Sequence, residues 1–600
     1  MALRANFPQG HLTISRLTEH KSESEEWYNL PDMQTALARQ QIAALLDEAV
    51  RSAQQKGLIP PTAIPPSPIE RPANPAFGDY ASTLALKLAR SAGMNPGQIA
   101  RILAAEMPAS PIVGKVNVAG PGFINFTLSD QWLDDQVNTI VDLDEAFGTI
   151  DLGHGTTVQV EFVSANPTGP LPVASGRGGA LGDSLARVLS AAGYKAWREY
   201  YVNDHGSRIE ALGQSIFARY AQQFGLDVQV PAEGYLGEYL VDFARYLKDT
   251  EGDRYLTMPR EEATAELARV GVAYFVDSIK SDLERLGINY DCWFSEQTLY
   301  DQSEVQRVLD MLRQGGYIAT REGAIWFVSS ALGEDKDNVL VRSNGEPTYF
   351  ASDIAYHYNK FVVRGFDRVI DVWGADHLGH VGRTRAAVGA LGITPDRLQI
   401  VIHQMVTLKV GGQPVRMSKR TGKIITLSEL LDEVGCDACR FFFVSRSADS
   451  HLDFDLDLAK KQSDENPVFY VQYAHARICS ILRKAAGIDY RDADVTLLRH
   501  PAELALIRKM LELPEIVETA ATTLEPHHLP HYAMELAAVF HSLYTQCRVI
   551  SDDPAMTRAR LKLVDAARVA LRNTLDLIGV SAPEEMWREN EGDSVESPQP

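Results

Sequence analysis

The sequence predicts a multidomain α/β protein with a nucleotide-binding fold at its centre, and three observations lead to that prediction. An apolar, alternating strand pattern at residues 158–163 is followed by a Gly/Pro turn and a glycine-rich helical stretch. Strand and helix patterns alternate again over residues 368–403, which is typical of βα units. From residue 462 to about 583 every informative window has a helical period, so an all-helical domain should follow.

The N-terminal part of the chain predicts a separate small domain. Residues 1–31 have no clear period, and we expect a disordered extension there. Residues 32–130 then combine helical stretches at 37–53 and 81–92 with two strand-like pieces around a Gly-Pro-Gly turn at 120–122. This mixture is typical of an α+β domain of about a hundred residues.

The central strand–turn–helix unit has the composition of a phosphate site. Residues 166–170, NPTGP, fit neither a helix nor a strand interior. The helix that follows is expected to start among the glycines at 176–179, where free backbone N–H groups and the helix dipole favour an anion. Many βα units without a ligand share this pattern, so the unit alone does not identify a site.

The remaining boundaries follow from changes of period and composition. Residues 150–460 form the central domain, and the helical, polar stretch at about 207–290 is interpreted as an insertion into it. The helical domain is expected over residues 461–586. The acidic tail at 587–600, with Pro and Ser, is expected to be disordered.

Composition limits the class of protein. With 600 residues, 45% hydrophobic and 23% charged, the chain has enough apolar material for several cores. A net charge of −21 argues against a protein that coats nucleic acid in general, although a local basic surface could still bind one. No apolar run could cross a bilayer, and the N-terminus lacks a signal-peptide core, so a cytoplasmic location is expected.

The five cysteines give no metal site. Cys436 and Cys439 form a C-x-x-C within a predicted helix, and no second pair completes a zinc set. We expect two buried or half-exposed helical thiols there.

Several separate blocks of sequence resemble class I aminoacyl-tRNA synthetases and, more narrowly, bacterial arginyl-tRNA synthetases. The resemblance extends from about residue 32 to about residue 586 and rests on VEFVSANPTGPL, REYYVNDHG, TYFASDIAYH, VWGADH, RMSKRTGKIITLSELLDEVG, SHLDFDLDLA and NPVFYVQYAHARICSIL. It implies an additional tRNA-binding domain at the N-terminus, a Rossmann-like class I catalytic domain and a helical anticodon-binding domain. It further implies ATP with Mg²⁺, L-arginine and tRNA(Arg) as partners, a requirement for tRNA in arginine activation, and a monomer.

The resemblance assigns an arginine site to Glu161, Asn166, Tyr349 and Asp353. A guanidinium is planar and always charged, and a carboxylate can accept two of its hydrogen bonds at once. Asn166 matches the residue that holds the α-amino group. From the sequence alone Asp353 could instead cap a helix at 354–358, whereas Glu161, at the end of an apolar strand, is harder to explain structurally.

The resemblance also assigns the nucleotide and tRNA sites. The expected ATP-binding residues are Gly176, Gly374, Asp376, His377, Met417 and Ser418, and the expected catalytic residues are Lys419, Arg416, Arg420 and Ser175. The Lys419 ammonium would stabilise the negative charge that develops on the leaving pyrophosphate. Outside the family, a basic segment like residues 416–420 is more often a solvated loop. The expected tRNA contacts are Phe123, Asn125, Tyr473 and Arg477. Phe123 could equally be a strand core residue, as we expect for Phe126.

One departure from the family pattern affects the chemistry. The family has His-x-Gly-His directly after the Pro-Leu pair, where this chain has Pro172, Val173, Ala174 and Ser175. Loss of one transition-state donor costs roughly a hundred- to a thousandfold in rate, unless His205 or His380 substitutes. Three hypotheses stay open: an arginine–tRNA ligase, a degenerate paralogue that binds tRNA or arginine with weak or no adenylation, and a functional duplicate with a nucleotide pocket reshaped to exclude an inhibitor.

Overall fold

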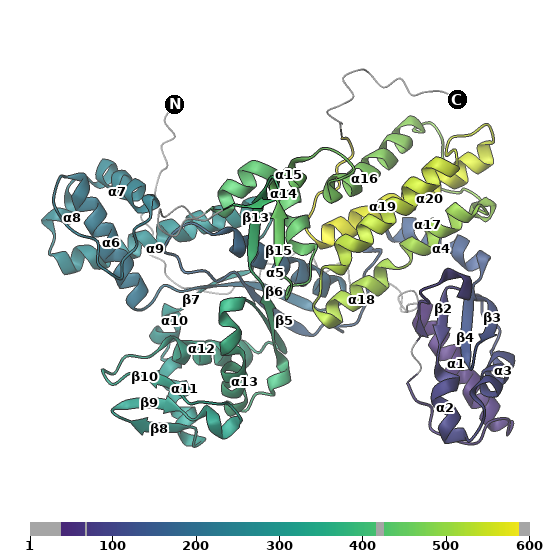
Figure 1. The fold of residues 1–600 in the computed structure, drawn as a ribbon, viewed down its shortest axis with the longest axis horizontal. Coiled ribbons are helices and arrows are strands. Elements are labelled where there is room, and N and C mark those ends of the chain that lie inside the picture. The colour runs from purple at the N-terminus through teal and green to yellow at the C-terminus, as the bar shows by residue number, and fades with distance from the viewer. Residues whose placement is uncertain (1–37, 67–68, 416–424, 587–600) are drawn as a thin grey trace. The chain divides into compact units, whose positions relative to one another are not determined.

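The computed structural model describes residues 38–66, 69–415 and 425–586 (Figure 1). Its elements confirm the multidomain α/β prediction: a small α+β domain, a central parallel sheet with a helical insertion, and a C-terminal helical domain. Within these described ranges no helix has the length and apolar character needed to span a membrane.

The N-terminal domain is an antiparallel sheet with helices. Its four strands, in the order β1-β2-β4-β3, are β1 (Ile69–Glu70), β2 (Tyr80–Ser82), β4 (Phe123–Leu128) and β3 (Val113–Ala119). The helices are α1 (Ala38–Gln55), α2 (Leu84–Ala92) and α3 (Pro96–Glu106). The helices expected at 37–53 and 81–92 are therefore confirmed, except that residues 80–82 are a strand. α4 (Asp130–Leu143) leads to the central domain.

The central domain is built on a five-stranded parallel sheet. The order is β12-β11-β5-β6-β7, from β12 (Leu398–His403), β11 (Arg368–Gly374), β5 (Thr157–Phe162), β6 (Lys195–Val202) and β7 (Cys292–Ser295). The chain passes from β5 through α5 (Val173–Ala191) to β6 on one side, and later adds β11 on the other side of β5. The strand order therefore reverses between β5 and β11, which is where open α/β sheets bind ligands.

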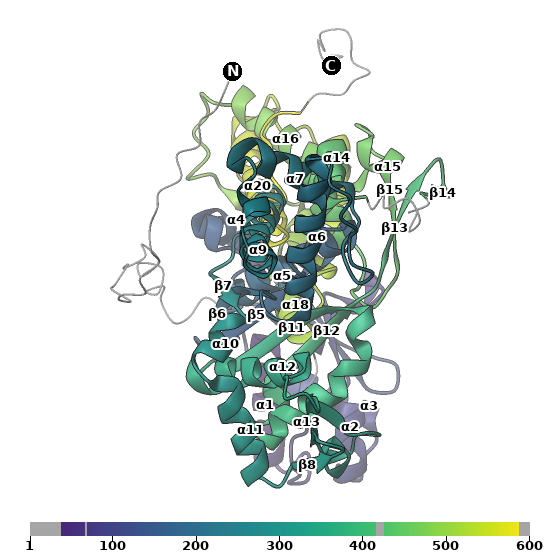
Figure 2. The same ribbon diagram turned by 90° about the vertical axis from the view of Figure 1, so that its left-hand side faces the viewer.

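The expected insertion is helical and has a core of its own. It comprises α6 (Ser207–Gln223), α7 (Glu238–Glu251), α8 (Arg254–Thr257) and α9 (Arg260–Arg285), and Figure 2 shows α6, α7 and α9 side by side. Leu212, Phe243 and Phe275 are buried between these helices. The insertion therefore folds around an apolar cluster separate from the one under the parallel sheet.

A second layer follows β7 and carries several of the expected site residues. It contains α10 (Gln297–Asp301), α11 (Glu304–Gln314), α12 (Tyr349–Tyr358), a π-helical turn (Asn359–Val363) and α13 (Val381–Ala390). The three-stranded sheet β10-β9-β8 completes it, from β10 (Asn338–Val341), β9 (Ala324–Phe327) and β8 (Ile318–Arg321). Residues 343–345 form a turn between β10 and α12.

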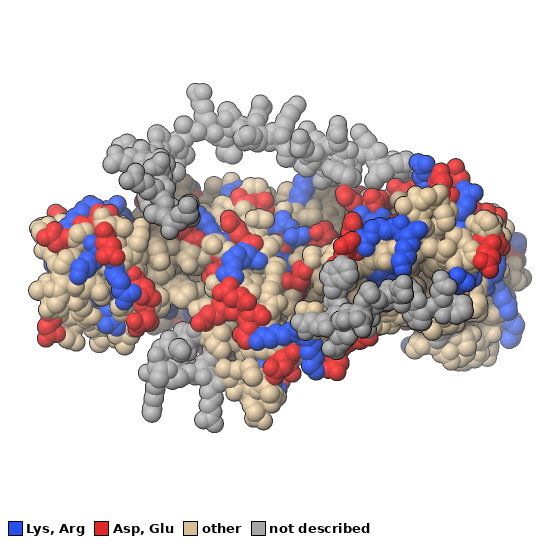
Figure 3. Space-filling view, turned by 90° about the horizontal axis from the view of Figure 1, so that it is seen from above, with Lys and Arg blue, Asp and Glu red and all other residues tan. Residues whose placement is uncertain are grey.

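The C-terminal part contains a last small sheet and then helices alone. The sheet joins β14 (Gln413–Pro414), β13 (Val406–Val410) and β15 (Leu452–Asp455), with α14 (Leu427–Val444) and α15 (Leu456–Lys460) beside it. The helical domain consists of α16 (Pro467–Lys484), α17 (Pro501–Met510), α18 (Leu513–Thr523), α19 (His528–Gln546) and α20 (Pro554–Leu577). On the face in Figure 3, basic and acidic side chains are interspersed.

The glycine-rich helix differs from its prediction in one respect. α5 starts at Val173, before the glycines, and Pro172 is its N-cap. The glycines lie inside the helix because its neighbours approach too closely for side chains. A Cβ at Gly182 would lie 2.2 Å from Cγ of Phe162, and one at Gly176 would lie 2.6 Å from Cδ1 of Leu427.

Two buried charges on α5 connect it to the rest of the central domain. Arg177, fully buried, donates to the carbonyl oxygens of Gln404 (2.8 Å), Ser450 (2.9 Å) and Ser447 (2.9 Å). Asp183 accepts hydrogen bonds from three guanidinium groups, those of Arg187, Arg198 and Arg440. The three cations lower the pKa of the Asp183 carboxyl against the opposing effect of its burial.

Replacing Gly182 with alanine should destabilise the protein by about 1–3 kcal/mol, because the buried Phe162 ring, stacked on Tyr290, cannot move away from the added methyl group. Chemical denaturation measures the change. Gly487→Ala is the matched control, since a Cβ there meets nothing within 4 Å. Equal stability of the two variants would contradict the close packing of α5.

Candidate active site

The turn after β5, at the carboxyl end of the parallel sheet, is strained. Val163 and Ser164 have φ values of 68° and 40°, a region that β-branched residues rarely adopt. The turn is held in place because Ser164 accepts a hydrogen bond from the Tyr201 N–H (3.1 Å) and its carbonyl accepts one from Asn203 (3.1 Å). Backbone strain of this kind clusters at functional sites. Asn166 follows two residues later, half-buried.

Glu161 has structural partners that the sequence did not reveal. Its carboxylate pairs with the ammonium of Lys360, which is fully buried, and accepts a hydrogen bond from Ser164 Oγ (2.7 Å). Lys360 lies in the π-helical turn after α12 and also contacts Asp371 Oδ1 at 2.8 Å. Although burial would raise the pKa of Asp371, the Lys360 ammonium lowers it to about 2. Both oxygens of Glu161 are thus engaged by partners within the protein.

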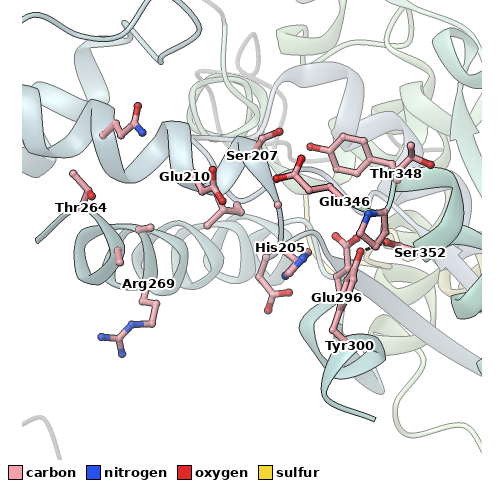
Figure 4. Close-up of a pocket in the computed structure, with 18 of the residues that line it drawn as sticks. His205, Ser207, Glu210, Thr264, Arg269, Glu296, Tyr300, Glu346, Thr348 and Ser352 are labelled. Carbon is pink, nitrogen blue, oxygen red and sulfur yellow. Dashed lines mark hydrogen bonds between the residues drawn. The ribbon is translucent and has the colours of Figure 1, made fainter. Parts of the chain in front are cut away.

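A cavity of about 630 Å³ opens between the helical insertion and the second layer (Figure 4). In Figure 4, His205, Glu296, Tyr300 and Ser352 lie together at one end, while Thr264 and Arg269 lie at the other. The acidic residues that line it are Asp204, Glu210, Glu261, Glu296 and Glu346. Tyr349 is also part of the lining. This excess of carboxylates suits a cationic ligand.

Glu296 is a site residue that the sequence analysis missed. Its side chain is only 2% exposed, and burial, reinforced by the nearby Asp353 and Asp204 carboxylates, raises its pKa to about 7. Its Oε2 atom is buried and has no hydrogen-bond partner among the described residues. Glu296 follows directly after β7, and its position at the end of a strand was the one available signal. Glu296 is part of the cavity lining, and its ionised carboxylate can accept hydrogen bonds from a ligand.

Asp353 is not a helix N-cap. α12 begins at Tyr349 after the N-cap Thr348, so Asp353 lies inside the helix and shares a face with Tyr349, four residues earlier. Burial raises the pKa of Asp353. The structure thus brings Tyr349, Asp353 and Glu296 together from two separate elements.

The expected nucleotide residues lie at the end of β11. Gly374 is the last residue of that strand, and Asp376 and His377 follow in a 3₁₀ turn with their side chains largely exposed. Gly176 is different, because Leu427 and Phe443 occupy the space where its side chain would be. Packing therefore explains this glycine without a ligand.

The altered positions 172–175 form the first turn of α5. Pro172 is exposed, and its side chain provides no capping hydrogen bond. It forms an isolated β-bridge with Thr426, and the Leu427 N–H donates to the Leu171 carbonyl (2.8 Å). Residues 416–424, and with them the predicted Arg416, Met417, Ser418, Lys419 and Arg420, lie outside the described residues. The described residues Thr426 and Leu427 thus lie beside positions 171–172, at the first turn of α5.

Neither of the two histidines considered as substitutes is bonded to positions 172–175 in the described ranges. His205 stacks on Tyr300 at 3.9 Å, and its Nδ1 pairs with Gln297 at 2.8 Å. His380 caps α13, with its ring 5.2 Å from that of His377.

A second cavity, of about 460 Å³, lies on the N-terminal domain and is lined by Phe77, Phe123 and Asn125 among others. Phe123 is 39% exposed, so it is not a core residue, whereas Phe126 is fully buried as expected. In the helical domain, the Arg477 guanidinium lies 4.9 Å from the ring centres of both Tyr473 and Tyr544. Both places combine aromatic and polar groups, as single-stranded RNA requires.

Three family models together cover most of the chain. Residues 39–128 match the arginyl tRNA synthetase N terminal domain, residues 136–442 the catalytic domain of tRNA synthetases class I (R), and residues 471–586 the DALR anticodon binding domain. Among curated proteins, the chain is 54% identical to an arginine--tRNA ligase of Dehalococcoides mccartyi over 543 residues, which are 90% of this chain and 98% of the relative. It is 52% identical to one of Heliobacterium modesticaldum over 557 residues, 91% of this chain and 99% of the relative.

Solved structures share the fold. An arginyl-tRNA synthetase of Thermus thermophilus superposes with a TM-score of 0.72 at 24% identity, covering 91% of this chain and 100% of that one. One of Plasmodium falciparum gives 0.70 at 18% identity, covering 92% and 100%.

Proposed function

The chain belongs to the arginyl-tRNA synthetase family, and we propose that it is an arginine–tRNA ligase, which uses ATP to activate arginine and transfers it to the 3′ end of tRNA(Arg). The observation that carries this proposal is the acidic cavity. Tyr349 and the buried Glu296 line it, and Asp353 lies one turn after Tyr349 on α12, near enough to raise the pKa of Glu296. Two carboxylates and a hydroxyl match the donors of a guanidinium, which the single ammonium of lysine cannot reproduce.

Arginine recognition then divides between two groups of residues. Asp353, Glu296 and Tyr349 receive the guanidinium, while Asn166, on the strained turn, holds the α-amino group. Glu161 is already paired with Lys360 and Ser164, so we assign to it the support of this turn together with a contact to the substrate. In this division, the acidic end of the cavity selects the arginine side chain. The carboxyl ends of the strands hold the reacting carboxylate of arginine.

Adenylation needs positioning and charge stabilisation, because no covalent enzyme intermediate is formed. The arginine carboxylate attacks the α-phosphate of ATP, and pyrophosphate leaves. The nucleoside is held at the end of β11 by Gly374, Asp376 and His377. The ATP-binding loop contains Met417 and Ser418. The charge on the leaving pyrophosphate is neutralised by Lys419, Arg416 and Arg420. The first turn of α5, with its N–H groups directed at the anion, contributes through the helix dipole. Gly176 acts indirectly, because its lack of a side chain lets Leu427 and Phe443 pack against α5.

Mg²⁺ is expected to arrive with ATP. It prefers phosphate oxygens together with one or two carboxylates, and the Asp376 side chain, 82% exposed at the end of β11, fits that requirement. The ion would offset the charge of the triphosphate. We further propose that the protein acts as a monomer, and that Phe123, Asn125, Tyr473 and Arg477 contact tRNA.

A second candidate function is a paralogue that binds tRNA or arginine with weak or no adenylation. The observation in its favour is the first turn of α5: Pro172 has no N–H or polar side chain to donate, and Ser175 offers only a neutral hydroxyl.

Arginine-dependent ATP–pyrophosphate exchange, measured with and without cognate tRNA, tests the main proposal. We expect exchange that requires tRNA. A triple variant, Pro172→His, Ala174→Gly and Ser175→His, is measured beside it. Exchange in the triple variant alone would support the second candidate function.

The Michaelis constant for arginine should depend on pH through Glu296. With a pKa of about 7, this carboxyl group is ionised at pH 8 and mostly protonated at pH 6, and only the ionised form pairs with the guanidinium. KM for arginine should therefore rise as pH falls below 7, by up to about tenfold per pH unit. Glu296→Gln should raise KM at pH 8 and remove the dependence. Glu346→Gln, at an exposed position of the same cavity, is the control; a similar pH profile in the Glu296 and Glu346 variants would contradict the assignment.

Substitution of the N-terminal cavity should weaken tRNA binding alone. Phe123→Ala and Asn125→Ala should each raise KM for tRNA roughly tenfold, since stacking and hydrogen bonds to a base contribute about 1–3 kcal/mol. KM values for ATP and arginine should not change. Asn117→Ala removes the exposed neighbour directly opposite Asn125 on β3 and should leave all three constants unchanged. An equal effect of Asn117→Ala would show that the cavity is not the contact.

A further inference from the structure

His403 lies at the carboxyl end of the parallel sheet. It is the last residue of β12 and pairs in parallel register with Gly374, the last residue of β11. A Cβ at Gly178 would lie 2.9 Å from the Nε2 atom of His403, and one at Gly374 would lie 3.9 Å from it. The imidazole therefore lies between α5 and the end of β11, where ligands bind in open α/β sheets.

The surroundings of the ring keep it neutral. Burial, and then the neighbouring Arg177 guanidinium, lower the pKa of His403 to about 4. A neutral imidazole has one donor and one acceptor nitrogen, so it can bond to a ribose hydroxyl, a purine nitrogen or a phosphate oxygen without a change of charge.

One nitrogen of the His403 ring lacks a well-formed hydrogen bond to the described part of the protein. No bond of good geometry reaches the buried Nδ1 atom among the described residues. A weak hydrogen bond to the backbone of Gln404 opposes the fall in the pKa of His403, and the Gln404 carbonyl also accepts from Arg177 (2.8 Å). A buried ring nitrogen that serves packing alone normally has a well-formed hydrogen bond, and Nδ1 of the half-buried His403 has none among the described residues.

We propose that His403 contacts ATP, and that its imidazole supplies in this chain a hydrogen bond to the nucleotide that Pro172 and Ser175 cannot. The inference rests on the proposed ligase activity and adds to it a nucleotide-binding residue from another strand. Gly178, on the second turn of α5 and three residues after Ser175, leaves the room that the ring occupies.

The first test compares His403→Ala and His403→Gln with the unmodified protein in ATP–pyrophosphate exchange. Loss of a direct contact should lower kcat/KM for ATP roughly a hundredfold, with KM for arginine changed less than twofold. His451→Gln is the control, because His451 is 54% exposed and bonded to Thr407; it should change neither constant. The melting temperature of each variant distinguishes a lost contact from a damaged fold.

The second test uses Gly178→Ala alone and combined with His403→Ala. A methyl group at position 178 displaces only the far end of the His403 side chain, so Gly178→Ala should also lower kcat/KM for ATP. In the double variant the methyl group fits, and kcat/KM for ATP should stay as low as in His403→Ala. A ring that merely fills space predicts the opposite, because the methyl group would refill the gap and restore activity.

Two results would overturn the inference: kcat/KM for ATP within twofold of the parent in a folded His403→Ala variant, or recovery of activity in the double variant. If the unmodified protein shows no exchange, the ligase proposal fails independently. Calorimetric titration with ATP and Mg²⁺ then decides the role of His403, since the contact requires weaker ATP binding in His403→Ala and His403→Gln than in the parent and the His451→Gln control.

Discussion

The close approach of α5 to its neighbours is the constraint on which the central domain depends. The space for a side chain is filled by Phe162 at Gly182, by Leu427 at Gly176 and by Ile288 at Gly179. Each glycine would weaken an isolated helix by about 1 kcal/mol relative to alanine. The helix is therefore stabilised by its packing against neighbouring residues. This packing also fixes its first turn at the carboxyl end of the parallel sheet.

Buried charges complete what close packing begins. Arg177 donates hydrogen bonds to three carbonyl oxygens in two loops, and Asp183 accepts hydrogen bonds from three guanidinium groups. One of these, Arg440, also donates to the carbonyls of Leu286 and Ile578, which joins α5 to the chain after α20. Breaking such a buried pair leaves a charge without compensation and costs several kcal/mol. The nucleotide crevice is thus supported by contacts to segments far away in the sequence.

Local patterns were sufficient to predict much of the fold, and long-range pairing accounts for most of what they missed. Alternation of apolar residues identified β5, β11 and β12, and helical periods identified the insertion and the C-terminal domain. By contrast, the pairing of Glu161 with Lys360 joins residues 199 positions apart, and the position of Glu296 beside Asp353 depends on how β7 and α12 meet. Neither produces a local signal. The start of α5 was misjudged because glycines were taken as a helix start, whereas here they serve packing.

The fit between His403 and Gly178 also makes the position of the ring depend on the residue at 178. A Cβ at position 178 would lie 2.9 Å from the His403 Nε2 atom, so the imidazole keeps its present position only beside glycine. No such steric dependence ties His403 to Pro172 or Ser175, which lie six and three residues before Gly178 at the start of α5. The histidine could therefore have been gained while the original signature was still present, and the loss of that signature need not have passed through an intermediate without a histidine at the crevice.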